Sequence, residues 1–310
     1  MSYSPIPAGP SPAGPSHAGP IHASMAMPPA APKKPLFEHW IEATLLLPLL
    51  LVLALFSLVP AGWVLLNSLK VDGAWSLGNF AEILGAPFYM QALANSLWIS
   101  IGSSVAGLAI ALVGAASIKR VDGPVRDLTV AFTNMASNLS GVPLAFAFII
   151  IMGTNGALTL LLRDWGVGDS FNIYSRAGLT LIYTYFQVPL AVLLLYPAFD
   201  ALQDDWQDCA ALLGASTLRY WRLIALPVIL PAVLGTFVLL FANAMGAYAS
   251  AYALMGSNYN LVTTRISSLV AGDIFLEPNL AAALSVLLIA MLVILVTVNQ
   301  LLLKRSYRAR

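Results

Sequence analysis

The chain has 310 residues, of which 59% are hydrophobic and only 9% are charged. A soluble globular domain would have roughly 25% charged residues, so this composition excludes one and indicates a protein that crosses a membrane several times. The net charge of +1 says little alone, because the position of the positive residues relative to the bilayer is what matters. Since Cys209 is the single cysteine, an intrachain disulfide and a cysteine-based metal site are excluded.

The N-terminal stretch, residues 1–36, differs from the rest because it is rich in proline, alanine and glycine and contains half of the 20 prolines. Such a composition cannot bury a core, so we expect a disordered tail. His17 and His22 in such a tail are too few to predict a metal site. We expect one membrane domain over residues 37–303 and a short basic segment at residues 304–310.

Six apolar segments follow the tail, each close to the roughly 20 residues that a helix needs to cross about 30 Å of hydrocarbon. They lie at residues 43–69, 95–117, 128–152, 179–198, 228–255 and 280–303. This pattern predicts an all-α, polytopic membrane protein with six transmembrane helices. A further short helix from Leu158 to Trp165 is expected at the membrane interface, with Trp165 at the level of the lipid headgroups.

The positively charged residues predict which loops face the cytoplasm. One face would carry 11 of the 15 lysines and arginines, from the tail, the 118–127 loop, the 199–227 segment and the C-terminus. The other face would carry Lys70, Arg163, Arg176 and Arg265. By the positive-inside rule, both termini and the 199–227 segment are expected in the cytoplasm.

The predicted spans contain polar side chains but no full charge near their middle, whereas ion-coupled transporters usually have ionisable groups there. Hydrogen bonding between helices accounts for such polar residues in many cases. The alternative is a polar lining for a translocation path. The candidates for that lining are Asn138, Ser140, Asn243, Tyr248 and Tyr252. Tyr248 and Tyr252 are four residues apart, so they share one face of a helix.

The segment from Asp200 to Pro227 is a polar, helix-patterned stretch between apolar spans. Phe199, Leu202, Trp206, Cys209 and Leu213 would form one apolar stripe, and four aspartates would face the other way. Gly214 would interrupt the helix, Ser216 would cap a second one and Pro227 would end it. We therefore expect two short helices that meet at a glycine corner on the membrane surface.

This segment resembles the EAA motif, EAA-x3-G-x9-I-x-LP, of the permease subunits of binding-protein-dependent ABC importers. Asp208-Cys209-Ala210, Gly214 and Ile224-Ala225-Leu226-Pro227 stand at the spacing of that motif. Two positions depart from it, because Asp208 replaces the usual Glu and Cys209 the first Ala. The region from Tyr183 to Leu287 is similar to permeases for polyamines, ferric iron, thiamine, sulfate and phosphonates.

The resemblance implies a type I ABC importer permease in the bacterial plasma (inner) membrane. Its partners would be two cytoplasmic ATPases, a second permease, an extracytoplasmic solute-binding protein and lipid, with no role for nucleic acid. The chain itself would be no enzyme and hold no cofactor, because ATP and Mg²⁺ would bind the ATPases. The expected ATPase-coupling residues are Asp208, Ala210, Leu212, Leu213, Gly214, Ala215, Ser216, Arg219, Leu226 and Pro227.

Three functions stay open at this point. The first is an importer permease, with a polyamine or another small charged solute as the expected cargo and a sugar or polyol as the alternative. The second is a secondary transporter, which would be expected to have paired repeats and intramembrane ionisable groups. The third is a membrane scaffold or regulator, for which the motif would have no purpose.

Overall fold

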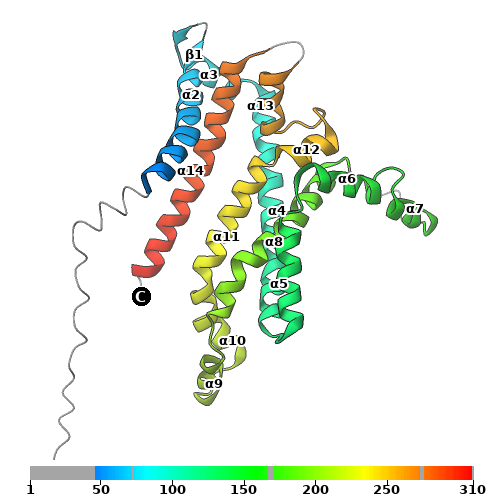
Figure 1. The fold of residues 1–310 in the computed structure, drawn as a ribbon, viewed down its shortest axis with the longest axis vertical. Coiled ribbons are helices and arrows are strands. Elements are labelled where there is room, and N and C mark those ends of the chain that lie inside the picture. Colours follow the sequence, from blue (N-terminus) through cyan, green and yellow to red (C-terminus); the bar gives the residue numbers. More distant parts are fainter. Residues whose placement is uncertain (1–45, 72, 167–170, 273–275, 309–310) are drawn as a thin grey trace, which may run out of the picture. The chain divides into compact units, whose positions relative to one another are not determined.

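The computed structural model describes residues 46–71, 73–166, 171–272 and 276–308, so the predicted tail at residues 1–36 lies outside the described residues. Contacts divide the chain into two units, residues 1–56 and residues 57–310. The described part of the first unit, residues 46–56, is helical. The second unit, which contains every described element from Val59 onward, is drawn in Figure 1.

Six helical segments in the described residues are long and apolar enough to cross a membrane, which is the number expected from the sequence, although the third, Gly141–Asp164, is interrupted at residues 153–156 and differs from the predicted span at residues 128–152. They are Leu46–Ser68, Pro87–Lys119, Gly141–Asp164, Arg176–Asp200, Thr217–Gly246 and Pro278–Lys304. The all-α class is also confirmed, because a two-stranded antiparallel hairpin is the one sheet in the described part of the chain. Its strands are β1 (Lys70–Val71) and β2 (Ala74–Trp75).

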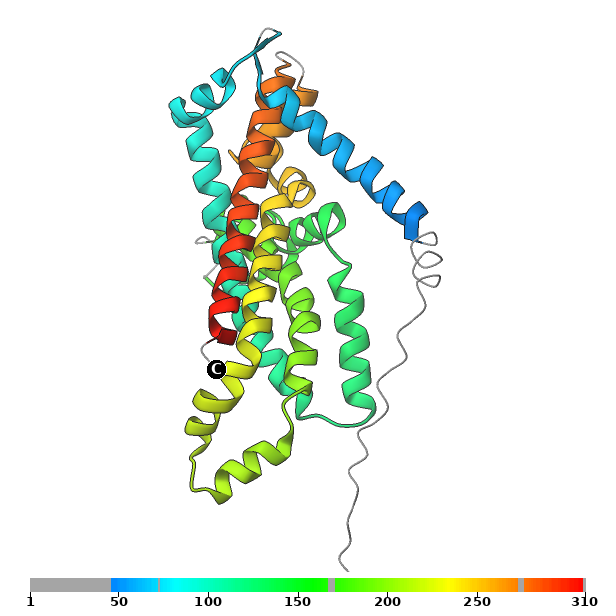
Figure 2. The ribbon, with the colours of Figure 1, turned by 90° about the vertical axis from the view of Figure 1, so that its left-hand side faces the viewer.

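The second unit has two well-separated ends. Helices α9 (Asp204–Leu212) and α10 (Thr217–Tyr220) lie at one end, and β1, α3 (Gly78–Gly85) and α13 (Val262–Ala271) at the other (Figure 1). A quarter turn of the view shows the same separation (Figure 2). Three further elements are the π-helical turn η1 (Ala54–Leu58), α2 (Val59–Ser68) and α14 (Pro278–Arg308), and α14 packs against α2.

The centre of the unit is the pair α4 (Pro87–Lys119) and α8 (Arg176–Asp200), which pack closely because most of the buried residues of α4 are Gly, Ala or Ser. Small side chains let two helix backbones approach, which is the usual way that membrane helices associate. Gly107 marks the tightest point, since a Cβ there would lie 3.1 Å from Cβ of Gln187. Gln187 is fully buried and donates to Ser103 Oγ at 2.8 Å.

The predicted span at residues 128–152 is not one helix. The chain forms α5 (Pro124–Ser137), breaks at residues 138–140, and starts again as α6 (Gly141–Met152). Gly141 has φ +73°, a value that favours glycine. Pro143 falls in the first turn of α6, where its missing N–H costs no hydrogen bond. The short helix expected from Leu158 to Trp165 is present as α7 (Ala157–Asp164).

The predicted span at residues 228–255 is also divided. Helix α11 (Leu226–Gly246) ends at Ala247, and α12 (Tyr248–Met255) follows. The expectation that Pro227 ends a helix is wrong, because the helix runs without interruption from Thr217 to Gly246. The π-helical turn η3 (Trp221–Ala225) precedes the proline, and its wider backbone accommodates a residue that lacks an N–H donor.

Candidate functional site

The glycine corner between α9 and α10 is built as the sequence predicts, by a helix end that needs a left-handed residue. Gly214 has φ +76°. Its N–H donates to the Ala211 carbonyl at 2.9 Å, and the Ala215 N–H donates to the Ala210 carbonyl at 2.9 Å. This pair of bonds is the Schellman ending of a helix. Ser216 then caps α10 by accepting from the Arg219 N–H.

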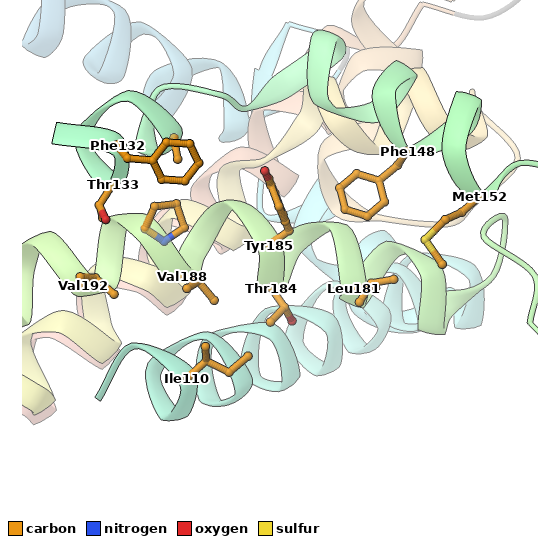
Figure 3. A pocket seen from close by; sticks show the side chains of 12 residues that line it. Ile110, Phe132, Thr133, Phe148, Met152, Leu181, Thr184, Tyr185, Val188 and Val192 are labelled. Atoms are coloured by element: carbon orange, nitrogen blue, oxygen red, sulfur yellow. The ribbon is translucent and has the colours of Figure 1, made fainter. Parts of the chain in front are cut away.

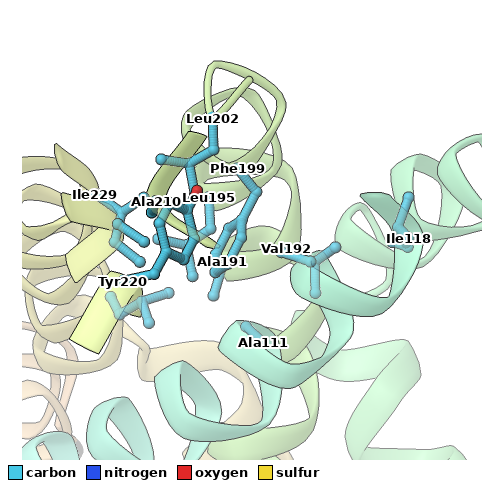
Figure 4. Packing of buried hydrophobic residues seen from close by; sticks show 13 residues of the cluster. Ala111, Ile118, Ala191, Val192, Leu195, Phe199, Leu202, Ala210, Tyr220 and Ile229 are labelled. Atoms are coloured by element: carbon cyan, nitrogen blue, oxygen red, sulfur yellow. The ribbon is translucent and has the colours of Figure 1, made fainter. Parts of the chain in front are cut away.

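The apolar stripe expected on one helix is instead shared between two elements. Phe199 belongs to α8 and Leu202 to the turn that follows, and both are buried. Helix α9 begins at Asp204, so Asp200 is not on the same helix as the later aspartates. Figure 4 shows Phe199 and Leu202 packed with Ala210 of α9 and Tyr220 of α10, in one cluster with residues of α4 and α8.

This packing leaves the side chains at the tip of the corner exposed among the residues that the structure describes. Leu212 is 89% exposed and Leu213 is 87% exposed, although they stand next to a buried cluster. A groove of about 340 Å³ runs beside them and is lined by Trp206, Leu223 and other mostly apolar residues. Exposed leucines in a rigid turn are typical of a surface that a partner covers.

The expected coupling residues separate into three groups in the structure. Six are exposed at the corner and its flanking helices: Asp208, Leu212, Leu213, Gly214, Ser216 and Arg219. Ala210 is buried and Ala215 half-buried, so both belong to the support of the corner rather than to its tip. Leu226 and Pro227 lie in the first turn of α11, away from the corner.

A second polar region forms where the two helix breaks meet. The Ser250 hydroxyl of α12 donates to the Gly141 carbonyl at 3.2 Å, and the Tyr183 hydroxyl of α8 donates to the Ala247 carbonyl. Broken helices within a membrane need such partners, because lipid offers their freed backbone groups none. A cavity of about 480 Å³ opens between the breaks, and Ser140, Asn243 and Phe186 are among its lining residues.

Three of the five candidate path residues line this cavity, namely Ser140, Asn243 and Tyr248. Tyr252 stacks on Tyr248 with ring centres 5.2 Å apart, but it lies outside the lining. Asn138 also lies outside, and its side chain donates to the Asn134 carbonyl at 2.9 Å. Phe186 and Ser250 also line the cavity but were not among the predicted path residues, because an apolar residue or a serine in an apolar span gives no local signal of a cavity.

A separate cavity of about 640 Å³ lies between α4, α5, α6 and α8 (Figure 3). Its lining is almost entirely apolar, with Phe132 from α5, Phe148 from α6 and Leu181 from α8. The Tyr185 ring meets Phe148 edge to face, with ring centres 5.3 Å apart. The polar groups in this lining are the hydroxyls of Thr133, Thr184 and Tyr185, and none of them is charged.

Comparison with known proteins identifies the family. The model of the family described as "Binding-protein-dependent transport system inner membrane component" matches residues 103–308. The molybdenum transport system permease protein ModB of Mycobacterium tuberculosis is 28% identical over 226 residues, which are 70% of this chain and 81% of ModB. The sulfate transport system permease protein CysT of Salmonella typhimurium is 23% identical over 81% of this chain and 89% of CysT.

The thiamine transport system permease protein ThiP of Brucella suis is 24% identical over 81% of this chain, which spans only 46% of ThiP. A crystal structure of a bacterial ABC transporter that imports the acidic polysaccharide alginate contains a chain of the same fold. Its TM-score is 0.70 at 15% identity, over 88% of this chain and 96% of that one. This chain therefore belongs to the family of inner membrane components of binding-protein-dependent transport systems, the permease subunits of ABC importers.

Proposed function

We propose that this permease conducts a small charged solute, which an extracytoplasmic binding protein delivers, and that two cytoplasmic ATPases drive the transport through the α9–α10 corner. A second permease, either another copy or a different chain, would complete the path. The observation that carries this proposal is the pair Leu212 and Leu213, almost fully exposed on a turn that a Schellman ending and a buried cluster hold rigid. A rigid apolar tip loses little conformational entropy when a partner binds it.

The charges around the tip agree with a protein partner. Asp205 and Asp208 are exposed on α9, and Arg219 is exposed on α10. Charges around an apolar anchor give an interface its orientation and its association rate. A helix that only rests on lipid would usually have a lysine-rich polar face, which α9 lacks. On this proposal the corner and both termini lie in the cytoplasm, in agreement with the distribution of lysine and arginine.

The cavity between the helix breaks is our candidate for the path. Its polar lining residues are uncharged, so recognition of a charged solute would be the task of the binding protein. The relatives are named for molybdenum, thiamine and sulfate, and the related structure for an acidic polysaccharide. These names favour a charged cargo over a neutral sugar or polyol. They include no polyamine.

Reconstitution of the permease with its ATPases and binding protein tests whether the ATPases act through the α9–α10 corner. Leu212→Asp together with Leu213→Asp is expected to abolish co-purification of the ATPases, because each aspartate would have to be desolvated in an apolar interface. Leu212→Met with Leu213→Met keeps the apolar character and is the matched control. Co-purification that survives the double aspartate change, or uptake without any ATPase, would refute the proposal and favour a secondary transporter.

The test of the cargo is a calorimetric titration of the purified binding protein. Sulfate, molybdate, thiamine and spermidine represent charged solutes, and glucose and sorbitol represent neutral ones. Binding to one of the charged compounds is expected, whereas binding to glucose or sorbitol alone would contradict this part of the proposal.

A further inference from the structure

Two basic side chains hold the chain where it leaves α8 and enters the corner. Arg126, at the start of α5, donates from Nη2 to Asp200 Oδ1 at 2.9 Å and from Nε to the Tyr196 hydroxyl at 2.6 Å. Lys119, at the end of α4, donates from Nζ to the Leu202 carbonyl. We call these five residues the brace. It joins α4 and α5 to the turn from which α9 starts.

The brace is poorly suited to stabilising the fold. The side chains of Arg126 and Asp200 are 30% and 53% exposed, and ion pairs so open to solvent contribute little to the free energy of unfolding. The guanidinium also lies over the Tyr196 ring, 5.2 Å from its centre, so the contact with α8 fixes its direction as well as its position. The Tyr196 hydrogen bond raises the pKa of Arg126, so the guanidinium stays charged.

The brace is instead placed where it controls α5. None of the 14 residues of α5 is buried, so this helix has no core of its own to hold it. It packs on α8, and Val130 touches the edge of the buried cluster. The bonds from Arg126 are the polar link between the start of α5 and the end of α8.

The other end of α5 leads directly into the candidate path. A helix of 14 residues spans about 21 Å. After its last residue, Ser137, the chain passes through the break to Ser140 and Gly141, which line the polar cavity. Helix α5 is therefore a rigid connection between the turn before α9 and one edge of the cavity.

We propose that Arg126 and Lys119 are positioning residues that transmit movement of the α9–α10 corner through α5 to the cavity edge at Ser140 and Gly141. This inference rests on the proposed function, because it takes the corner to be the point where the ATPases act. A side-chain link of this kind couples two regions only if both ends belong to rigid elements. Helix α5 is an uninterrupted helix, and the corner is held by its Schellman ending and the buried cluster.

The experiment measures whether nucleotide at the ATPases changes the cavity edge. In the permease–ATPase complex, a Ser140→Cys reporter in a Cys209→Ala background is modified with a maleimide, with and without a non-hydrolysable ATP analogue. We expect the analogue to change the modification rate. Tyr196→Phe combined with Asp200→Asn removes the hydroxyl acceptor and the negative charge that hold Arg126 but keeps the side-chain shapes, and it should weaken this change roughly 2- to 30-fold.

Arg120→Ala is the matched control, because it removes a positive charge from the same loop and Arg120 is exposed. It should leave the nucleotide effect unchanged. Arg126→Ala should weaken the effect no further when it is added to the double variant, since all three changes break one link. Lys119→Met tests the second half of the brace in the same way.

Two results would overturn the inference. One is a full nucleotide effect in the Tyr196→Phe/Asp200→Asn variant, and the other is no nucleotide effect in the reference chain. Both leave the proposed function untouched, because that proposal fails only if the aspartate variants at Leu212 and Leu213 keep their ATPases or uptake needs none. Co-purification of the ATPases with each brace variant therefore accompanies every rate measurement.

Discussion

Gly214 determines the shape of the corner through its backbone alone. A Cβ at this position would meet no atom within 4 Å, so there is space for a larger residue. The restriction is the φ of +76°, which costs an L-residue about 1–2 kcal/mol. Asparagine tolerates this region better than other residues, whereas β-branched residues tolerate it worst.

This difference gives a graded prediction. Gly214→Val is expected to distort the Schellman ending and reduce substrate-stimulated ATPase activity of the assembled complex strongly, and Gly214→Asn is expected to reduce it much less. The measurement is ATP hydrolysis with saturating loaded binding protein. Full stimulation in the valine variant would show that the corner tolerates another shape and would count against its role in docking.

At the scale of residues, the spacing of the motif predicted where the corner lies. It did not predict which side chains face the protein and which face solvent. The distances from Asp208 to Gly214 and Pro227 predicted where the helix breaks. They did not predict that Ala210 is buried while Leu212 and Leu213 are exposed. An apolar residue on an amphipathic helix can face its own chain or a partner, and periodicity is the same in both cases. Here Ala210 faces its own chain, because it belongs to one buried cluster with Tyr220 and Leu202.

At the scale of elements, the two broken spans support each other through backbone carbonyls. Tyr183 donates to the carbonyl at the end of α11, and Ser250 of α12 donates to the carbonyl at the start of α6. A buried carbonyl that loses its partner costs about 1–3 kcal/mol, although membrane hydrogen bonds often contribute less. The breaks are thus stabilised by tertiary hydrogen bonds rather than by their own sequence.

Tyr183→Phe is therefore expected to destabilise the chain by about 1 kcal/mol, because it removes the tertiary hydrogen bond to the Ala247 carbonyl. For a chain of this size that change lowers the midpoint of thermal unfolding in detergent by about 2–4 °C. Tyr185→Phe, two residues along the same helix, is the control, since it removes a hydroxyl that stands at the apolar cavity. Equal midpoints for the two variants would contradict this account.

Hydropathy predicted the six spans but not these breaks. The second interrupted segment is apolar around its break, and an apolar run has no local signal that distinguishes one helix from two with a turn between them. The first contains Asn138 and Ser140 at its break, but isolated polar residues also occur inside unbroken membrane helices. Gly141 and Pro143 hinted at the first break. For the second, Gly246 was the only local sign, and the contact that stabilises it comes from Tyr183, 64 residues away.

At the scale of the whole molecule, the single cysteine offers a direct test of orientation. Cys209 is exposed on α9, next to the corner that we place in the cytoplasm. A membrane-impermeant maleimide is expected to label it in inverted membrane vesicles and to leave it unlabelled in intact spheroplasts. Addition of the ATPases to the vesicles should slow the labelling, because the corner becomes covered.

The Cys209→Ala chain is the blank in both preparations. Labelling of the native chain in spheroplasts would reverse the proposed topology, including the placement of both termini. Rapid labelling in vesicles that is unaffected by the ATPases would keep the topology but remove the ATPases from this face.

The π-helical turn at Trp221–Ala225 affects the direction in which the α9–α10 corner points relative to α11. In this turn the Leu226 N–H reaches back to the Trp221 carbonyl, so the helix holds one residue more than an α-helical turn would. Each residue of an α-helix advances the rotation by about 100°. Because the wide turn takes up this extra residue, deleting one residue here would restore an α-helical turn and leave the corner close to its present direction. A deletion in the α-helical part of α11 would instead turn the corner by about that angle around the helix axis. The π-helical turn therefore absorbs one residue of sequence without changing where the corner points.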